Sequence, residues 1–70
     1  MFWWFERGGK FIRCEAREVS KEVYDLIVEM PDGTEAIEHF SDQAALSARQ
    51  AALGRALKIE GWTGPRGWQP

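Results

Sequence analysis

The chain has 70 residues, a length that fits one domain, and a domain of this size buries only about 60% of the surface that its unfolded chain exposes. Nine basic and eleven acidic residues give a net charge of -2, and the two signs are mixed along the chain, so general attraction to phosphate is weak. Cys14 is the single cysteine, which excludes an internal disulfide, and no Cys/His set has zinc spacing. Stability must therefore come from a well-packed aromatic core or from assembly.

The first five residues form an apolar run that is too short for a signal peptide or a membrane span. A lone cysteine fits a reducing compartment. We expect a cytoplasmic location and no association with a membrane.

Four consecutive aromatic residues, Phe2 to Phe5, follow the initial methionine. Successive side chains of a β-strand point to opposite faces, so a strand with this sequence is aromatic on both faces and needs cover on both. The rest of the chain supplies only one helix. We therefore expect the second face to be covered by the C-terminal tail, a second subunit, a partner or a ligand.

Gly8 and Gly9 separate this aromatic run from the alternating stretch Phe11 to Val19, and a Gly-Gly pair suits a two-residue hairpin turn. The hairpin register sets Phe5 opposite Ile12 and Trp3 opposite Cys14 on one face. On the other face it sets Trp4 opposite Arg13 and Phe2 opposite Glu15.

The second predicted hairpin turns at Pro31-Asp32-Gly33, where proline presets φ and glycine closes the turn. Its register pairs the following residues: Met30 with Thr34, Val28 with Ala36, Tyr24 with Phe40, Glu29 with Glu35, Ile27 with Ile37, and Asp25 with His39. Joining the two hairpins sets Val19 opposite Val23, Arg17 opposite Asp25 and Arg13 opposite Glu29. Opposite charges across strands favour this register.

One face of the resulting sheet is apolar, and its predicted members are Trp3, Phe5, Ile12, Cys14, Ala16, Tyr24, Leu26, Val28, Met30, Ala36 and Phe40. The other face carries charges and four apolar side chains, Phe2, Trp4, Ile27 and Ile37. A helix is expected to follow Phe40, with Ser41 or Asp42 as its N-cap and an apolar stripe built on Leu46, Leu53 and Leu57 and flanked by Ala45, Ala52 and Ala56.

The helix is predicted to reach Glu60, because Gly61 suits a left-handed position just past a helix end. Trp62 would then fold back on Leu57. The segment Thr63 to Pro70 has no periodicity, and we interpret it as a flexible tail.

The sequence offers little for catalysis. Asp25 and His39 are expected to face each other on an open sheet face, where no cleft would shift a pKa, so we assign no catalytic residue. Cys14 faces the predicted core and is expected to be inert. No phosphate-binding or metal-binding spacing occurs, so no cofactor and no metal are expected.

Trp4, Arg13 and Arg17 share the charged face and could stack against and attract a single-stranded nucleic acid. Four antiparallel strands followed by a helix resemble, in element order, the modules of Whirly and Pur-alpha type single-strand binders, which pair as dimers. That resemblance implies single-stranded nucleic-acid binding as the alternative function. Four carboxylates, Glu15, Asp25, Glu29 and Glu35, share the same face and argue against nucleic acid as a partner.

We therefore predict an α+β fold, a four-stranded antiparallel meander of order 1-2-3-4 with one C-terminal helix on one face, over residues 1–62, and a tail over 63–70. The expected function is a small non-enzymatic protein-interaction module that forms a homodimer or binds a protein partner. Its candidate interaction surface comprises Phe2, Trp4, Arg13, Arg17, Ile27, Ile37 and Trp68.

Overall fold

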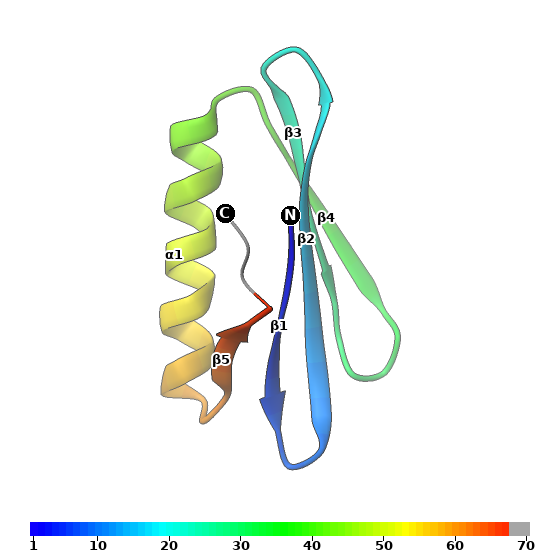
Figure 1. The fold of residues 1–70 in the computed structure, drawn as a ribbon, viewed down its shortest axis with the longest axis vertical. Coiled ribbons are helices and arrows are strands. Elements are labelled where there is room, and N and C mark those ends of the chain that lie inside the picture. Colours follow the sequence, from blue (N-terminus) through cyan, green and yellow to red (C-terminus); the bar gives the residue numbers. More distant parts are fainter. Residues whose placement is uncertain (68–70) are drawn as a thin grey trace.

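The computed structural model describes residues 1–67, which form five strands and one helix (Figure 1). The elements are β1 (Phe2–Arg7), β2 (Lys10–Ser20), β3 (Val23–Glu29), β4 (Glu35–Phe40), α1 (Gln43–Ile59) and β5 (Thr63–Arg66). The strands form one sheet of order β4-β3-β2-β1-β5, and α1 lies on one side of it. The predicted α+β fold, with a four-strand meander and one helix, is confirmed.

Both hairpins have the predicted registers. In the first, Trp3 lies opposite Cys14 and Phe5 opposite Ile12. In the second, Ile27 lies opposite Ile37, and the backbone N–H of Met30 donates to Thr34 O at 2.8 Å. The turn glycines Gly8, Gly9 and Gly33 all have positive φ, as hairpin turns of these types require.

The register between β2 and β3 is confirmed over most of its length, with Arg13 opposite Glu29 and Arg17 opposite Asp25. The predicted pairing of Val19 with Val23 is wrong. Ser20 lies opposite Val23, because the register shifts between Glu18 and Ser20. Such a shift accommodates an extra residue in one strand and lets the turn close at Lys21 and Glu22.

The prediction of an irregular tail from Thr63 onward is wrong for residues 63–66, which form β5 antiparallel to β1. The Thr63 hydroxyl donates to Glu6 O at 3.0 Å. At Gly64, an added Cβ would lie 3.0 Å from Trp4 O and 2.7 Å from Cδ2 of Phe5, so only glycine allows this close approach. The last three residues of the predicted tail lie outside the described part of the chain.

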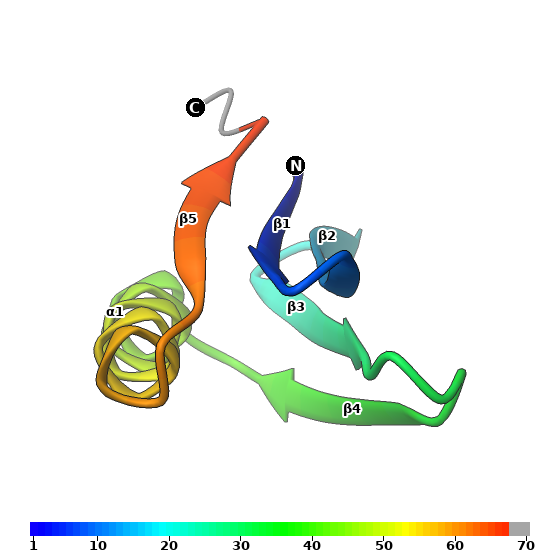
Figure 2. The same ribbon diagram turned by 90° about the horizontal axis from the view of Figure 1, so that it is seen from below.

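The sheet is curved, and α1 lies on its inner side where the curve opens, next to β5 (Figure 2). The inner face holds the core, whose buried members are Trp3, Phe5, Ile12, Cys14, Ala16, Leu26, Val28, Leu46, Leu57 and Trp62. Tyr24, Phe40 and Leu53 are partly buried against it. Aromatic side chains thus supply much of the apolar surface that a small domain must bury.

One helix does not cover the whole inner face. Met30 and Ala36, which the alternation predicted for the core, are exposed because α1 does not reach that end of β3 and β4. On the helix, Leu46 and Leu57 are buried as predicted, whereas Ala45 and Ala56 are exposed.

Both ends of α1 are capped by hydrogen bonds that the sequence signals predict. The N-cap is Asp42, whose carboxylate accepts from the backbone N–H of Ala44 at 2.7 Å. At the other end, Gly61 has φ 92° and donates to Lys58 O, while Trp62 donates to Leu57 O, both at 3.0 Å. These two bonds define a Schellman motif, and they bring Trp62 into the core beside Leu57.

Arg7 connects β1 to the end of the helix. Its Nη1 donates to Glu60 O at 2.7 Å, and its guanidinium lies 4.7 Å from the centre of the Trp62 ring. A cation at a helix C-terminus satisfies a free carbonyl and interacts favourably with the helix dipole. Strand β1 therefore helps to fix the turn at Gly61, after which the chain returns to β1 and pairs with it as β5.

Two glycines at and near the helix end should respond oppositely to substitution. Gly61→Val should lower the free energy of unfolding by about 1 kcal/mol or more, because a β-branched residue is strained at positive φ. Gly54→Ala should raise it by up to about 1 kcal/mol, because Gly54 lies inside α1 and an added Cβ would meet only Cζ of Phe5, at 3.9 Å. Urea unfolding followed by circular dichroism measures both, and equal effects of the two substitutions would contradict this description of the helix end.

Candidate functional site

The sheet face turned away from α1, here called the outer face, carries the predicted interaction residues. The registers place Phe2, Glu15, Ile27 and Ile37 in one row across the four strands of the meander. The next row contains Trp4, Arg13, Glu29 and Glu35. Since side chains alternate along each strand, Arg17 shares this face, and six of the seven predicted residues lie on one side of the sheet. Trp68, the seventh, lies outside the described residues.

Three aromatic side chains, Phe2, Trp4 and Phe11, form an aromatic patch at the β1 side of this face. The ring centroids of Phe2 and Trp4 lie 6.1 Å apart with an interplanar angle of 45°. Together with Arg13, the three residues line a hollow of about 220 Å³. Phe2 is 48% exposed, so a large apolar side chain stands open to solvent beside this hollow.

The chain covers part of the aromatic patch itself. An added Cβ at Gly67 would lie 2.8 Å from Cε3 of Trp4 and nearer still to Cζ3, so the backbone after β5 lies against the indole ring. Trp4 is accordingly half-buried. Of the four kinds of cover expected for this face, the C-terminal segment lies over Trp4, whereas Phe2 is exposed.

Two isoleucines extend the apolar surface toward the other edge of the sheet. Ile27 on the central strand β3 is 9% exposed, and its neighbour Ile37 on the edge strand β4 is 52% exposed. Glu15 separates these isoleucines from Phe2 within the row. The outer face is therefore an interrupted apolar surface rather than a continuous one.

The outer-face charges are largely paired with one another. Arg13 Nη1 lies 3.2 Å from Glu29 Oε1, and Arg17 Nη2 lies 3.9 Å from Glu15 Oε1. These pairs are exposed, so each contributes little to stability. The pairs matter for the charge of the face, because both arginines of the predicted interaction surface, Arg13 and Arg17, already have a carboxylate neighbour.

The contact between His39 and Asp25 predicted by the register is present, with Nδ1 2.6 Å from Oδ1. The imidazole is 74% exposed at the surface of the edge strand. An open position of this kind supplies neither the enclosure nor the positioned substrate groups that acid-base catalysis uses.

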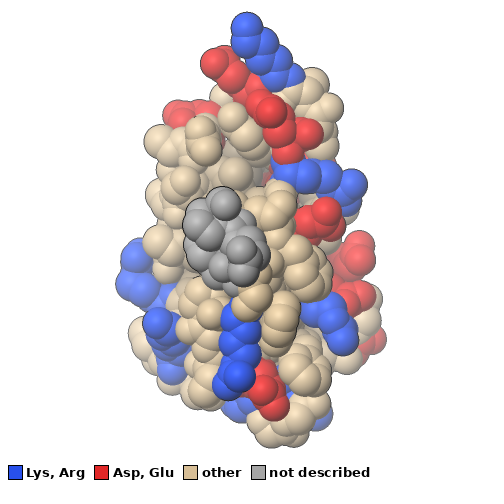
Figure 3. Space-filling view, in the orientation of Figure 1, with Lys and Arg blue, Asp and Glu red and all other residues tan. Residues whose placement is uncertain are grey.

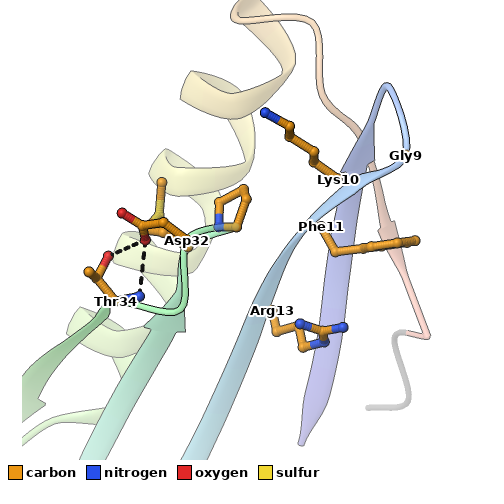
Figure 4. A pocket seen from close by; sticks show the side chains of 8 residues that line it. Gly9, Lys10, Phe11, Arg13, Asp32 and Thr34 are labelled. Atoms are coloured by element: carbon orange, nitrogen blue, oxygen red, sulfur yellow. Dashed lines mark hydrogen bonds between the residues drawn. The ribbon is translucent and has the colours of Figure 1, made fainter.

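A cleft of about 600 Å³ opens between the tips of the two hairpins (Figure 4). Gly9, Lys10, Phe11 and Arg13 line it from the first hairpin, and the β3–β4 turn with Met30, Pro31, Asp32 and Thr34 lines it from the second. The cleft exists because the β2–β3 pairing ends at Arg13 and Glu29, beyond which the hairpins separate. Phe11 and Arg13 also line the aromatic hollow, so cleft and patch are continuous.

Asp32 is held inside its own turn. Its Oδ1 accepts from the Thr34 hydroxyl at 2.7 Å and from the Thr34 backbone N–H at 3.0 Å (Figure 4). These bonds stabilise the charged form and lower the pKa of Asp32. Its carboxylate is thereby engaged in turn formation. Lys10 and Arg13 line the cleft from the first hairpin, and Arg13 is paired with Glu29.

The sequence interpretation missed Phe11 as part of the surface. Strand alternation from Arg13 places Phe11 on the outer face. The guanidinium carbon of Arg13 lies 5.8 Å from the centre of the Phe11 ring. The signal was present in the sequence. The hairpin-tip cleft had no such signal, because it depends on how two turns diverge in space.

Comparison with protein-family models, curated proteins and solved structures finds no match to this chain. Over residues 1–67, α1 is too short and too polar to cross a membrane, and no three metal-ligating side chains gather at one place.

The thiol of Cys14 gives a direct test of the inner face. Burial raises the pKa of this thiol to about 12, so at pH 8 on the order of one molecule in 10⁴ carries a thiolate. We expect iodoacetamide to label the native protein far more slowly than the urea-unfolded protein. Labelling of both states at the same rate would show that Cys14 is not enclosed by the core.

Proposed function

We propose that this protein is a small non-enzymatic interaction module that forms a homodimer through its outer face. The observation that carries the proposal is the aromatic patch on β1, where Phe2 is exposed next to a hollow lined by Trp4, Phe11 and Arg13. Strand β1 buries Trp3 and Phe5 in the core, so its remaining aromatic residues are held rigidly on the opposite face. Rigid aromatic side chains are favoured anchors of protein interfaces.

The charge pattern of the outer face favours contact with a second copy of itself. A two-fold dimer places the same patch on both sides of the interface, so the patch must complement itself. The outer face carries both signs in adjacent positions, as in Arg13 beside Glu29 and Arg17 near Glu15. Rotating one copy by 180° allows an arginine of one face to meet a carboxylate of the other.

The same charge pattern argues against single-stranded nucleic acid, the alternative that element order suggests. A phosphate-binding surface needs cations that are free to contact phosphates. Here Arg13 and Arg17 have carboxylate neighbours, and Asp25, Glu29 and Glu35 lie on the same face. We therefore propose a protein partner, and we extend the proposal to a cytoplasmic location on the ground of the single free cysteine.

Replacing aromatic residues of the patch should dissociate the dimer without unfolding the monomer. Phe2→Ser and the double substitution Phe2→Ser, Phe11→Ser remove exposed or half-exposed side chains, so circular dichroism should remain native. Light scattering coupled to size-exclusion chromatography, over about 10 µM to 1 mM protein, should show a dimer for the unsubstituted chain and a monomer for the double variant.

The control is Ile59→Ser, which removes an 87% exposed apolar side chain at the end of α1, away from the outer face. This variant should dimerise like the unsubstituted chain. A monomer for the unsubstituted chain at every concentration, or loss of the dimer in Ile59→Ser alone, would reject the homodimer.

A further inference from the structure

A second surface lies on the helix side of the molecule, in a shallow groove of about 340 Å³ between α1 and β5. Its lining consists of Phe5, Gln50, Ala51, Gly54, Arg55, Lys58 and Pro65. The floor is apolar and consists of Phe5, Ala51, Gly54 and Pro65. The rim is polar or cationic and consists of Gln50, Arg55 and Lys58. The groove is therefore amphipathic, with room for a side chain and charge beside it.

Gly54 keeps the floor of the groove open. It lies inside a 17-residue helix, where glycine is less favourable than alanine by about 1 kcal/mol. An added Cβ would fit, since its nearest neighbour would be Cζ of Phe5 at 3.9 Å. Packing of the domain thus does not require glycine here, and the missing side chain leaves the space above this part of the floor open.

The cations at the rim are free to bind an anion. Within residues 1–67, neither Arg55 nor Lys58 takes part in an ion pair. Residues 1–40 contain five basic and nine acidic side chains, whereas residues 41–67 contain four basic and two acidic. The space-filling view shows Lys and Arg side chains along the lower half of the helix side, while many of the visible acidic side chains lie over the strands (Figure 3). This side of an acidic protein is locally basic.

Gln50 adds a hydrogen-bonding group to the same lining. Its side-chain nitrogen is buried and has no hydrogen-bond partner in the described structure. A buried donor without an acceptor costs free energy, which an occupant with an oxygen acceptor would recover after a small rotation of this side chain. Two free cations and an unsatisfied amide therefore border one apolar floor.

We propose that the groove between α1 and β5 binds an acidic peptide segment of another protein, which inserts one large apolar side chain above Phe5 and Gly54. Carboxylates on either side of that anchor contact Arg55 and Lys58, and a carboxylate or backbone oxygen accepts from Gln50. A shallow groove fits one side chain of a longer segment better than it encloses a small molecule. Because the groove lies on the helix side and the aromatic patch on the outer face, this proposal does not depend on the homodimer.

The test is a nuclear magnetic resonance titration of the ¹⁵N-labelled full chain with an acidic peptide, Asp-Glu-Asp-Leu-Phe-Asp-Glu-Asp. Saturable shifts should appear at the amides of residues 50–58 and 63–66, and the affinity should fall as salt is raised from about 50 to 500 mM. A matched peptide with lysine at every acidic position should cause no saturable shift.

Two variants in the groove and one control outside it connect the shifts to the groove. Lys58→Glu should weaken binding about fivefold or more, whereas Lys21→Glu, the same charge change in the β2–β3 turn, should have less than about a twofold effect. Gly54→Leu should abolish binding by filling the floor, with retained helix content checked by circular dichroism.

The proposal would be overturned by no saturable shift with about 2 mM acidic peptide, by shifts centred on Phe2 and Phe11 instead of the groove, or by equal weakening by Lys58→Glu and Lys21→Glu. Binding that persists in Gly54→Leu would also exclude the apolar floor as the site. The oligomeric state of each variant, measured in parallel, separates failure of this proposal from failure of the homodimer.

Discussion

The structure depends on one constraint, the presence of aromatic side chains on both faces of β1. Side chains alternate along a strand, so burying Trp3 and Phe5 beneath the helix necessarily places Phe2 and Trp4 on the other side of the sheet. Trp3 and Phe5 are, with Trp62, the aromatic side chains buried in the core of the described residues, and a 70-residue domain with a single cysteine depends on burying large apolar side chains. Positions 2 and 4 are themselves aromatic, so the outer face of β1 carries aromatic side chains directly behind those of the core; the C-terminal segment lies against Trp4, whereas Phe2 is exposed.

The return of the chain to β1 supplies part of that cover and creates the second surface. The Schellman motif at Gly61, held by Arg7 from β1, reverses the chain so that β5 runs beside the first strand. Close approach at Gly64 seals one edge of Phe5, and Gly67 lies against Trp4. The same return leaves a groove where β5 passes the small residues of α1. The turn at Gly61 therefore shapes both the aromatic patch and the groove between α1 and β5.

Local patterns in the sequence predicted the features that depend on local chemistry. The Gly-Gly and Pro-Asp-Gly turns defined both hairpin registers, and cross-strand charges such as Arg13 and Glu29 defined the register between them. Three features depended on tertiary geometry instead. Strand β5 has only four residues, and they show no alternation. The bulge near Val19 adjusts the turn between β2 and β3. The hairpin-tip cleft opens where the pairing of β2 with β3 ends. For the site, alternation placed six surface residues on one face, but it could not show that Gly67 would cover Trp4.

In the homodimer that we propose, the outer face, which carries Phe2 and Trp4 because β1 buries Trp3 and Phe5, contacts a second copy of the chain. The most direct measurement is a ¹⁵N amide spectrum of the unsubstituted chain recorded over a range of protein concentrations from about 20 µM to 1 mM. The expected result is a set of concentration-dependent shifts at Phe2, Trp4, Phe11 and Ile37, with the amides of α1 unchanged. Spectra that do not change with concentration, or changes confined to α1 and β5, would contradict the claim.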